Sequence, residues 1–309
     1  MATRKILIVY DVPGWIWHRN AQQIQKNLPQ YDIDILPKKN VNDKVIERYD
    51  HTHFCGWELG LRWAEYVSAG ACSHNFETKQ AKLARENLSR FKKLTANSRK
   101  IESGVRQFNS HVYYAANGVD EELFQPLPYP ESGKFVVGWT GKIVDESAGF
   151  PSESDKVDYK GYNIILKPLI DYMKDEDVKF KLLAGNYKSC VPHDKMPLFF
   201  SDVGCQLCVS LLEGTPNPMF EAAACARPLI STDVGAISEF IDNSTGFNVG
   251  GYRSQKKVKT IVERVYASIM ILKKDRNMGK WMGQNARNKI EEGWTWKQRA
   301  KQFIPVFEE

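Results

Sequence analysis

The sequence has no long hydrophobic run. The first apolar stretch, residues 6–9, follows Arg4 and Lys5 but is too short for the core of a signal peptide. No stretch approaches the roughly 20 apolar residues that a transmembrane helix needs. We therefore expect a cytoplasmic protein whose contact with a membrane, if it has one, is peripheral.

Cysteine is scarce and scattered. The one closely spaced pair, Cys205-x-x-Cys208, has no second pair, and no further metal ligand is evident near His51 and His53. This pattern favours buried free thiols over a zinc site or a disulfide, and it fits a reducing compartment. The cysteines are Cys55, Cys72, Cys190, Cys205, Cys208 and Cys225.

Neither sign of charge dominates the chain. The 43 lysines and arginines stand against 37 acidic residues, which gives a formal net charge of +6. This excess favours phosphate-rich ligands or anionic surfaces, but it is too small for a dedicated nucleic-acid binder. A length of 309 residues predicts two domains.

The most informative stretch is 209–241. An apolar run over 207–212 predicts a buried strand that ends at Glu213. A turn follows, and then a helix with Asn217 as N-cap and Pro218 at its first position, which Arg227-Pro228 ends. Leu229 and Ile230 begin a second strand. This order of strand, loop, helix and strand predicts an α/β fold with a doubly wound parallel sheet.

Two glutamates stand out in this stretch. Glu213 lies in the loop at the carboxyl end of a strand, where such sheets bind ligands, and Glu221 lies in the predicted first turn of the next helix. Free N–H groups at that helix end attract an anion, so the carboxylates could bind hydroxyls on either side of a bound phosphate. Alternatively, Glu221 only complements the helix dipole and Glu213 is a solvated loop charge.

The string EGTPNPMFEAAACARPLISTDVGAISEFI resembles the E-x7-E segment of glycosyltransferase family 4, which are retaining enzymes of GT-B fold. Two further stretches resemble the family, namely Asn-Gly-Val-Asp at 117–120 and Trp-Thr-Trp-Lys at 294–297. The family usually has glycine where this chain has Ala226, and a double glycine where it has Gly235-Ala236. These departures are mild.

The resemblance implies two Rossmann-like domains with parallel sheets that face a central cleft. We expect residues 1–126 to form the acceptor domain and residues 127–295 to form the nucleotide-sugar donor domain, with a Pro-rich linker at 126–134. A final helix at about 296–309 is expected to cross back to the first domain.

The resemblance also assigns roles to single residues. Lys142 and Lys160 would hold the donor diphosphate, Glu213 would bind the transferred sugar, Glu221 the ribose, and His74 would face the donor sugar. Lys142 and His74 could equally be surface residues. Gly14 is either a phosphate contact or an ordinary turn glycine. The other expected donor contacts are Gly141, Gly185, Gly214, Thr215, Pro216 and Asn217.

The implied reaction moves a sugar from a nucleotide-diphosphate sugar to an acceptor hydroxyl on a glycan, a lipid or a small molecule, with retention at the anomeric carbon. The lysines replace a divalent metal in this reading, so no metal or other cofactor is required. Alternatives are transfer to nucleic-acid bases, although nucleic acid is not the expected partner, and a sugar-nucleotide binding protein without turnover. The acidic insert 143–159 is expected to be a mobile loop beside the phosphate site, because its composition offers little apolar surface to bury. It is either a lid or only an elaboration of the fold.

Overall fold

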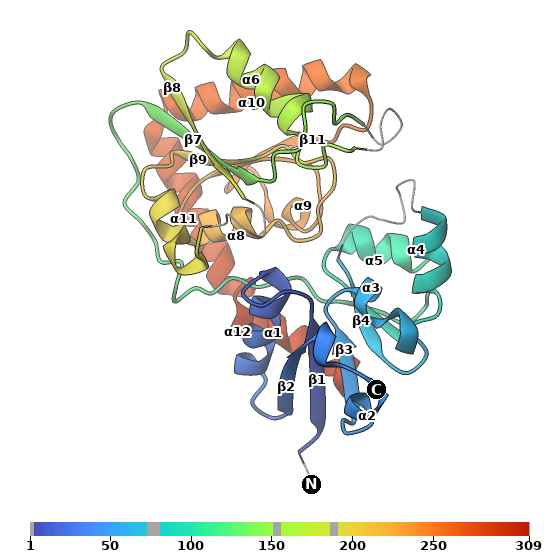
Figure 1. The fold of residues 1–309 in the computed structure, drawn as a ribbon. Coiled ribbons are helices and arrows are strands. Elements are labelled where there is room, and N and C mark those ends of the chain that lie inside the picture. Colours follow the sequence, from blue (N-terminus) through green and yellow to red (C-terminus); the bar gives the residue numbers. More distant parts are fainter. Residues whose placement is uncertain (1–2, 73–80, 151–155, 186–190, 309) are drawn as a thin grey trace. The chain divides into compact units, whose positions relative to one another are not determined.

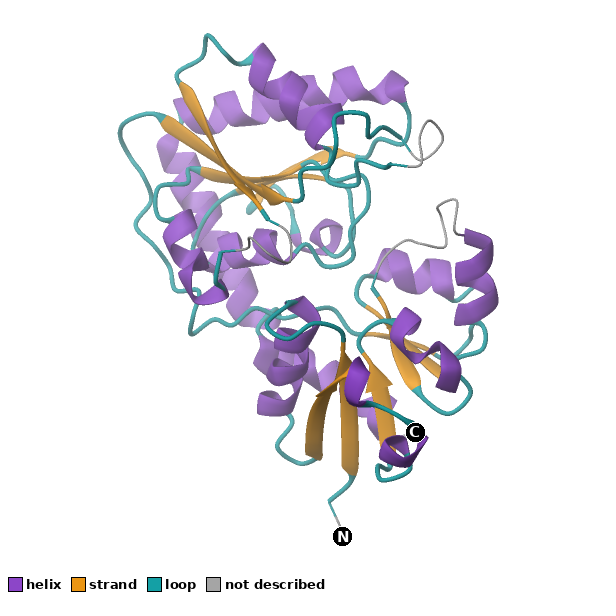
Figure 2. Cartoon of the chain, viewed as in Figure 1, coloured by secondary structure: helices purple, strands orange, loops and turns teal. Residues whose placement is uncertain are grey.

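The structure is a computed structural model that describes residues 3–72, 81–150, 156–185 and 191–308. The chain divides into two units (Figure 1). Unit 1 contains Met1–Gly118 together with Trp294–Glu309, and unit 2 contains Val119–Gly293. Each unit is built on a parallel sheet with helices on its faces (Figure 2), which confirms the predicted fold class.

The sheet of unit 1 has the order β2-β1-β3-β4-β5-β6. The apolar run at 6–9 lies in β1, and its side chains are fully buried because helices cover both faces of the sheet. The strands are β1 (Lys5–Tyr10), β2 (Asp32–Pro37), β3 (His51–Phe54), β4 (Ser68–Ala71), β5 (Lys93–Ala96) and β6 (Val112–Tyr114). The helices include α1 (Ile16–Asn27), α2 (Asp43–Ile46), α3 (Trp57–Gly60), α4 (Ala81–Leu88) and α5 (Arg99–Val105).

The end of the chain completes the core of unit 1. The final segment contains α12 (Trp296–Arg299), the 3-10 helix η6 (Ala300–Phe303) and α13 (Ile304–Glu308). Its Phe303 and Phe307 share a hydrophobic cluster with Ile6 and Ile8 of β1. A Cβ on Gly118 would come within 2.6 Å of the Trp296 backbone. Thus the Asn-Gly-Val-Asp and Trp-Thr-Trp stretches, far apart in sequence, pack against each other, and this close approach requires glycine.

Two polar groups lie beneath that final segment. The side chains of His51 and His53 both bond Ser68 Oγ, at 2.7 and 2.8 Å. Both rings also contact Phe307. Burial, together with neighbouring positive charge in the case of His51, lowers the pKa of each histidine to about 3. The pair is therefore neutral and packed within unit 1, with His53 buried and His51 half-buried.

The units do not divide where the Pro-rich linker predicts. The chain changes unit after Gly118 and returns at Trp294, whereas the sequence suggested boundaries at 126 and 296. The reason lies in hydrogen bonds made just before the linker and at its start. Leu127 N donates to Cys225 O at 3.3 Å, and Arg287 Nη1 donates to Phe124 O at 2.6 Å. These bonds attach the segment to unit 2.

The sheet of unit 2 has the order β11-β10-β9-β7-β8. Helices α6 and α10 cover one face, while α8, α9 and α11 lie on the other (Figure 1). The strands are β7 (Phe135–Gly141), β8 (Val178–Ala184), β9 (Cys205–Cys208), β10 (Leu229–Thr232) and β11 (Gly246–Gly250). The helices include α6 (Lys167–Tyr172), α7 (Met196–Phe200), α8 (Asn217–Ala224), α9 (Ile237–Phe240), α10 (Gln255–Lys274) and α11 (Arg276–Gly293).

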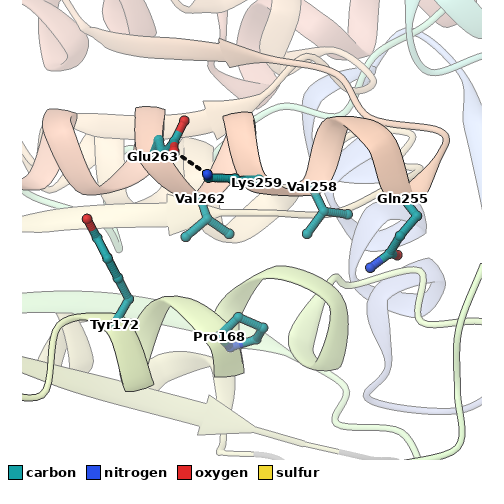
Figure 3. Close-up of a pocket in the computed structure, with 7 residues that line it drawn as sticks. All are labelled: Pro168, Tyr172, Gln255, Val258, Lys259, Val262 and Glu263. Carbon is teal, nitrogen blue, oxygen red and sulfur yellow. Dashed lines mark ion pairs between the residues drawn. The ribbon is translucent and has the colours of Figure 1, made fainter.

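A hollow of about 570 Å³ lies between α6 and α10. Figure 3 shows Tyr172 and Pro168 on α6 facing Val258 and Val262 on α10. The one carboxylate in this lining, Glu263, lies 3.9 Å from the Lys259 ammonium in an i,i+4 pair. The hollow is therefore mainly apolar, with its charges already paired.

In the described part of the chain, none of the helices combines the length and apolar character needed to cross a membrane.

The five described cysteines are free thiols, and Cys190 lies outside the described residues. Burial raises the pKa of all five, including Cys205 and Cys208 of the Cys-x-x-Cys pair. These thiols are consequently uncharged at neutral pH.

Candidate active site at the carboxyl edge of the second sheet

The predicted site residues of unit 2 gather where its strands end. Glu213 follows β9, Gly141 ends β7, and Gly185 follows β8. Gly185 N donates to Gly141 O at 3.3 Å, so these two glycines lie side by side at the ends of adjacent strands. The loops after β9 and β10 are also joined, because Ala236 N donates to Gly214 O at 2.8 Å. The carboxyl edge thus holds one continuous set of loops.

Lys160 and Glu213 form an ion pair at this edge. Lys160 Nζ lies 2.5 Å from Glu213 Oε1, and Ser210 Oγ donates to the same oxygen at 2.7 Å. The Glu213 side chain is only 12% exposed, and that of Lys160 is 36% exposed. Burial lowers the pKa of Lys160, but the adjacent Glu213 carboxylate outweighs burial and leaves that pKa above its usual value. The structure therefore brings together two residues that the sequence predicted to share a site.

A glycine positions the lysine. Gly161 has φ of +68°, and a Cβ there would lie 2.0 Å from Val209 O. The backbone beside Lys160 consequently runs directly against the backbone that leads to Ser210 and Glu213. Leu211 N donates to Tyr159 O at 2.9 Å and fixes the same approach. This contact requires glycine at position 161, because only a residue without a side chain lets the two backbones approach so closely.

The described ends of the insert before Lys160 pack against unit 2, and its composition did not predict these contacts. Asp158 is fully buried, and its carboxylate accepts hydrogen bonds from the N–H groups of Tyr162, Asn163 and Ile164 at 3.1, 2.6 and 3.0 Å. Phe150 is 2% exposed and contacts the Tyr252 ring. Residues 151–155 lie outside the described part. Composition does not reveal these contacts, because a single carboxylate caps the helical turn and a single aromatic ring joins the core.

Glu221 faces a partner that the sequence did not suggest. His193 Nε2 lies 2.9 Å from Glu221 Oε1, and the Phe124 ring meets the His193 ring edge-on at a centroid distance of 5.2 Å. The Glu221 side chain is 9% exposed and that of His193 is 26% exposed. His193 follows β8, so its place after a strand at the ligand-binding edge was the one signal available for it.

The helix that carries Glu221 begins slightly earlier than predicted. Its N-cap is Pro216, and Asn217 is the first helical residue rather than the cap. Glu221 therefore lies in the second turn, away from the free N–H groups. The correction weakens the idea that Glu221 only complements the helix dipole, since that effect fades beyond the first turn. Thr215 is buried in the loop between the two glutamates.

Three predicted residues are not placed with this group. Lys142 follows Gly141 at the carboxyl edge of the sheet. Its side chain is exposed and makes no hydrogen bond or ion pair with any described residue. Gly14 belongs to unit 1, where its N–H donates to His18 Nδ1 at 2.9 Å in a turn. His74 lies outside the described residues.

Comparison with known proteins supports this reading of the fold. Residues 177–267, which include both glutamates and His193, match the family model described as glycosyl transferases group 1. The structure is similar to sucrose-phosphate synthase from Thermosynechococcus elongatus, with a TM-score of 0.71, 14% identity and 98% coverage of each chain. It is also similar to Anabaena HepE in complex with UDP and glucose, with a TM-score of 0.67, 15% identity and coverage of 98% and 99%.

The fold is GT-B.

An uncharacterized glycosyltransferase of Methanocaldococcus jannaschii is 22% identical over 177 residues, which cover 48% of this chain and 42% of that protein. The chain thus matches less than half the length of this curated relative. In a GT-B fold, the carboxyl edge that holds Lys160, Glu213 and Glu221 is the edge at which an α/β sheet binds its ligands.

Proposed function

We propose that this chain is a glycosyltransferase of family 4 type, which moves a hexose from a nucleotide-diphosphate sugar to an acceptor hydroxyl with retention at the anomeric carbon. The observation that carries the proposal is the position of two largely buried glutamates, Glu213 and Glu221, in the loop and helix that follow β9, each held by a cationic or ionisable partner. The match of residues 177–267 to group 1 glycosyl transferases supports it.

The ion pair suggests how the leaving group is stabilised. Departure of a nucleoside diphosphate places negative charge on a phosphate oxygen, and a preorganised ammonium lowers the cost of that charge. Lys160 is already held at the edge by Glu213, so it needs little reorganisation when the donor binds. Exposed Lys142 would supply a second cation from the adjacent strand end. We therefore propose that transfer needs no divalent metal.

The same geometry argues against Glu213 as a covalent nucleophile. Its Oε1 accepts hydrogen bonds from both Lys160 and Ser210, and these bonds withdraw electron density from the carboxylate. We assign Glu213 to the hydroxyls of the transferred sugar and Glu221 to the ribose. Proton removal from the acceptor would then fall to a donor phosphate oxygen on the same face of the sugar.

UDP-sugars are the first donors to test, because HepE, which shares the fold, was obtained in complex with UDP and glucose. The acceptor is proposed to carry a hydroxyl on a glycan, a lipid or a small molecule. We further propose that the protein works in the cytoplasm, with peripheral membrane contact if the acceptor is a lipid.

A panel of UDP-, GDP- and ADP-sugars, screened by thermal shift, tests the donor proposal. We expect one nucleoside diphosphate to raise the unfolding temperature, because ligand binding to the folded state stabilises it by mass action. The best donor is then followed by chromatography for hydrolysis or transfer. Tight donor binding with no turnover would show a binding protein instead, and no shift with any sugar nucleotide would contradict the proposal.

A further inference from the structure

Unit 1 contains a second candidate site, in a cavity of about 480 Å³ at the amino-terminal ends of β3 and β4. This volume lies within the roughly 300–1,000 Å³ typical of small-ligand pockets. The cavity is at the opposite end of these strands from the loops that follow them, where an α/β sheet usually binds its ligands. It is therefore separate from the expected acceptor edge of the same unit.

The lining combines an apolar base with a polar rim. Trp63 and Val67 are buried and belong to the core of unit 1, whereas Tyr66 is 75% exposed and also lines the cavity. The carboxylates of Glu47 and Asp50 stand among the lining residues. A ligand that enters would meet the aromatic side chains of Tyr49, Trp63 and Tyr66, an apolar base and hydrogen-bond acceptors.

Two of these polar groups lack a partner. Thr52 is 3% exposed, and its Oγ1 makes no hydrogen bond within the described part of the chain. Thr52 alternates along β3 with His51 and His53, so it lies on the other face of the sheet from them, on the side of Trp63. A buried hydroxyl without a partner costs about 1–3 kcal/mol. Glu47 is exposed and has no side-chain partner among the described residues, so a ligand with hydroxyls would satisfy Thr52 and could also bond Glu47.

The charges around the cavity favour a neutral ligand. An anion would be repelled, because the charged side chains that line the cavity, among the described residues, are carboxylates. A cation would find the Trp63 ring already occupied, with Lys38 Nζ 4.1 Å and Arg62 Cζ 5.4 Å from its centroid. The third carboxylate, Asp43, is also already engaged, since it bonds Arg62 and Trp63 Nε1, each at 2.6 Å.

We propose that this cavity binds one neutral hexopyranose ring, either as a free sugar or as a unit of a longer glycan. Glu47 and Asp50 would accept hydrogen bonds from sugar hydroxyls. The Thr52 hydroxyl would form a hydrogen bond with a sugar hydroxyl at the base of the cavity. The exposed Tyr66 ring would pack on the apolar face of the sugar. The inference goes beyond the proposed transfer reaction, because it rests on unit 1 alone and uses none of the donor-site residues.

The experiment is calorimetric titration of the full chain with the methyl glycosides of glucose, mannose and N-acetylglucosamine, and with maltoheptaose. We expect saturable binding of at least one probe. Stronger binding of maltoheptaose than of methyl glucoside would identify a glycan chain as the ligand, and equal binding would identify a single ring. Absence of saturable binding, or tighter binding of choline than of every sugar, would overturn the proposal.

Variants locate the binding. Tyr66→Ala and Thr52→Val should each weaken sugar binding by roughly tenfold, a change that corresponds to about 1.4 kcal/mol. Tyr172→Ala is the matched control, because Tyr172 is also an exposed tyrosine, 62% accessible, and lines the mainly apolar hollow of unit 2 (Figure 3). This control should leave sugar binding unchanged.

Thr52→Val should fold at least as well as the parent protein, because it removes a buried hydroxyl that has no partner. Unchanged sugar affinity in both Tyr66→Ala and Thr52→Val would show that the sugar binds elsewhere and would refute the proposal. Nucleoside diphosphate binding, titrated separately, reports on the donor site. Absence of sugar binding with intact nucleoside diphosphate binding would refute the cavity proposal alone. Absence of nucleoside diphosphate binding with intact sugar binding would instead count against the proposed transferase function.

Discussion

Substitution of Gly161 tests whether this glycine builds the Lys160–Glu213 site. In Gly161→Ala, the new Cβ would lie 2.0 Å from Val209 O, so the backbone must move away by about 1 Å to relieve the clash. That movement separates the segment carrying Lys160 from the one carrying Glu213. We therefore expect a loss of both stability and donor turnover.

The magnitude can be estimated with a matched glycine. Gly133 has φ of +77°, close to the +68° of Gly161, but a Cβ there would have no atom within 4 Å. Both alanine variants incur about 1–2 kcal/mol of left-handed strain, partly offset by about 0.4–1 kcal/mol from a less flexible unfolded chain. Gly161→Ala adds an overpacking cost of about 1–3 kcal/mol.

Urea unfolding of both variants, followed by tryptophan fluorescence, measures this difference. We expect Gly133→Ala to lose about 1 kcal/mol or less, and Gly161→Ala to lose about 2–4 kcal/mol. Gly133→Ala should retain full donor hydrolysis. Equal losses in the two variants, or full activity in Gly161→Ala, would refute the role of this close backbone contact.

Three further predictions address the metal, the unexpected histidine and the buried histidine pair. Transfer activity should survive EDTA, and complete loss that manganese or magnesium restores would show that the lysines do not replace a metal. His193→Ala should weaken nucleoside diphosphate binding by about 1–3 kcal/mol, because it leaves the buried Glu221 carboxylate without its partner, whereas exposed His111→Ala should not. Since burial lowers the pKa of His51 and His53 to about 3, both stay neutral when folded but take up protons when unfolded below about pH 6.5. Stability should therefore be complete above pH 6.5 and fall toward pH 3, with a slope approaching about 1.4 kcal/mol per pH unit for each histidine; identical urea midpoints at pH 7 and pH 5 would contradict this.

Local patterns were enough to predict the fold and part of the site. The apolar run before Glu213 and the Asn-Pro helix start indicated a strand and a helix of a parallel sheet, and the sheet topology confirms this. The Lys-Gly pair at 160–161 was placed near Glu213 only through the family resemblance. Ala226 shows why related enzymes favour glycine there, since its φ of +57° lies in the left-handed region.

The remaining features depend on contacts that no local pattern encodes. Asp158 caps a helical turn only once Tyr162, Asn163 and Ile164 have their N–H groups aligned, so composition alone suggested a loose acidic loop. His193 meets Glu221 because β8 ends, and the helix after β9 begins, at the same edge of the sheet. A lone histidine before a short helix carries no periodic signal, and its partner lies 28 residues away.

The central claim is that Glu213 and Glu221 bind different parts of one sugar nucleotide. It is tested most directly by measuring nucleoside diphosphate affinity and sugar-transfer turnover for Glu213→Gln and Glu221→Gln. We predict that Glu221→Gln weakens nucleoside diphosphate binding by about 1–3 kcal/mol, the scale of a charged hydrogen bond. Glu213→Gln should instead reduce turnover and leave that affinity nearly intact. Equal losses of nucleoside diphosphate affinity in the two variants would contradict the assignment.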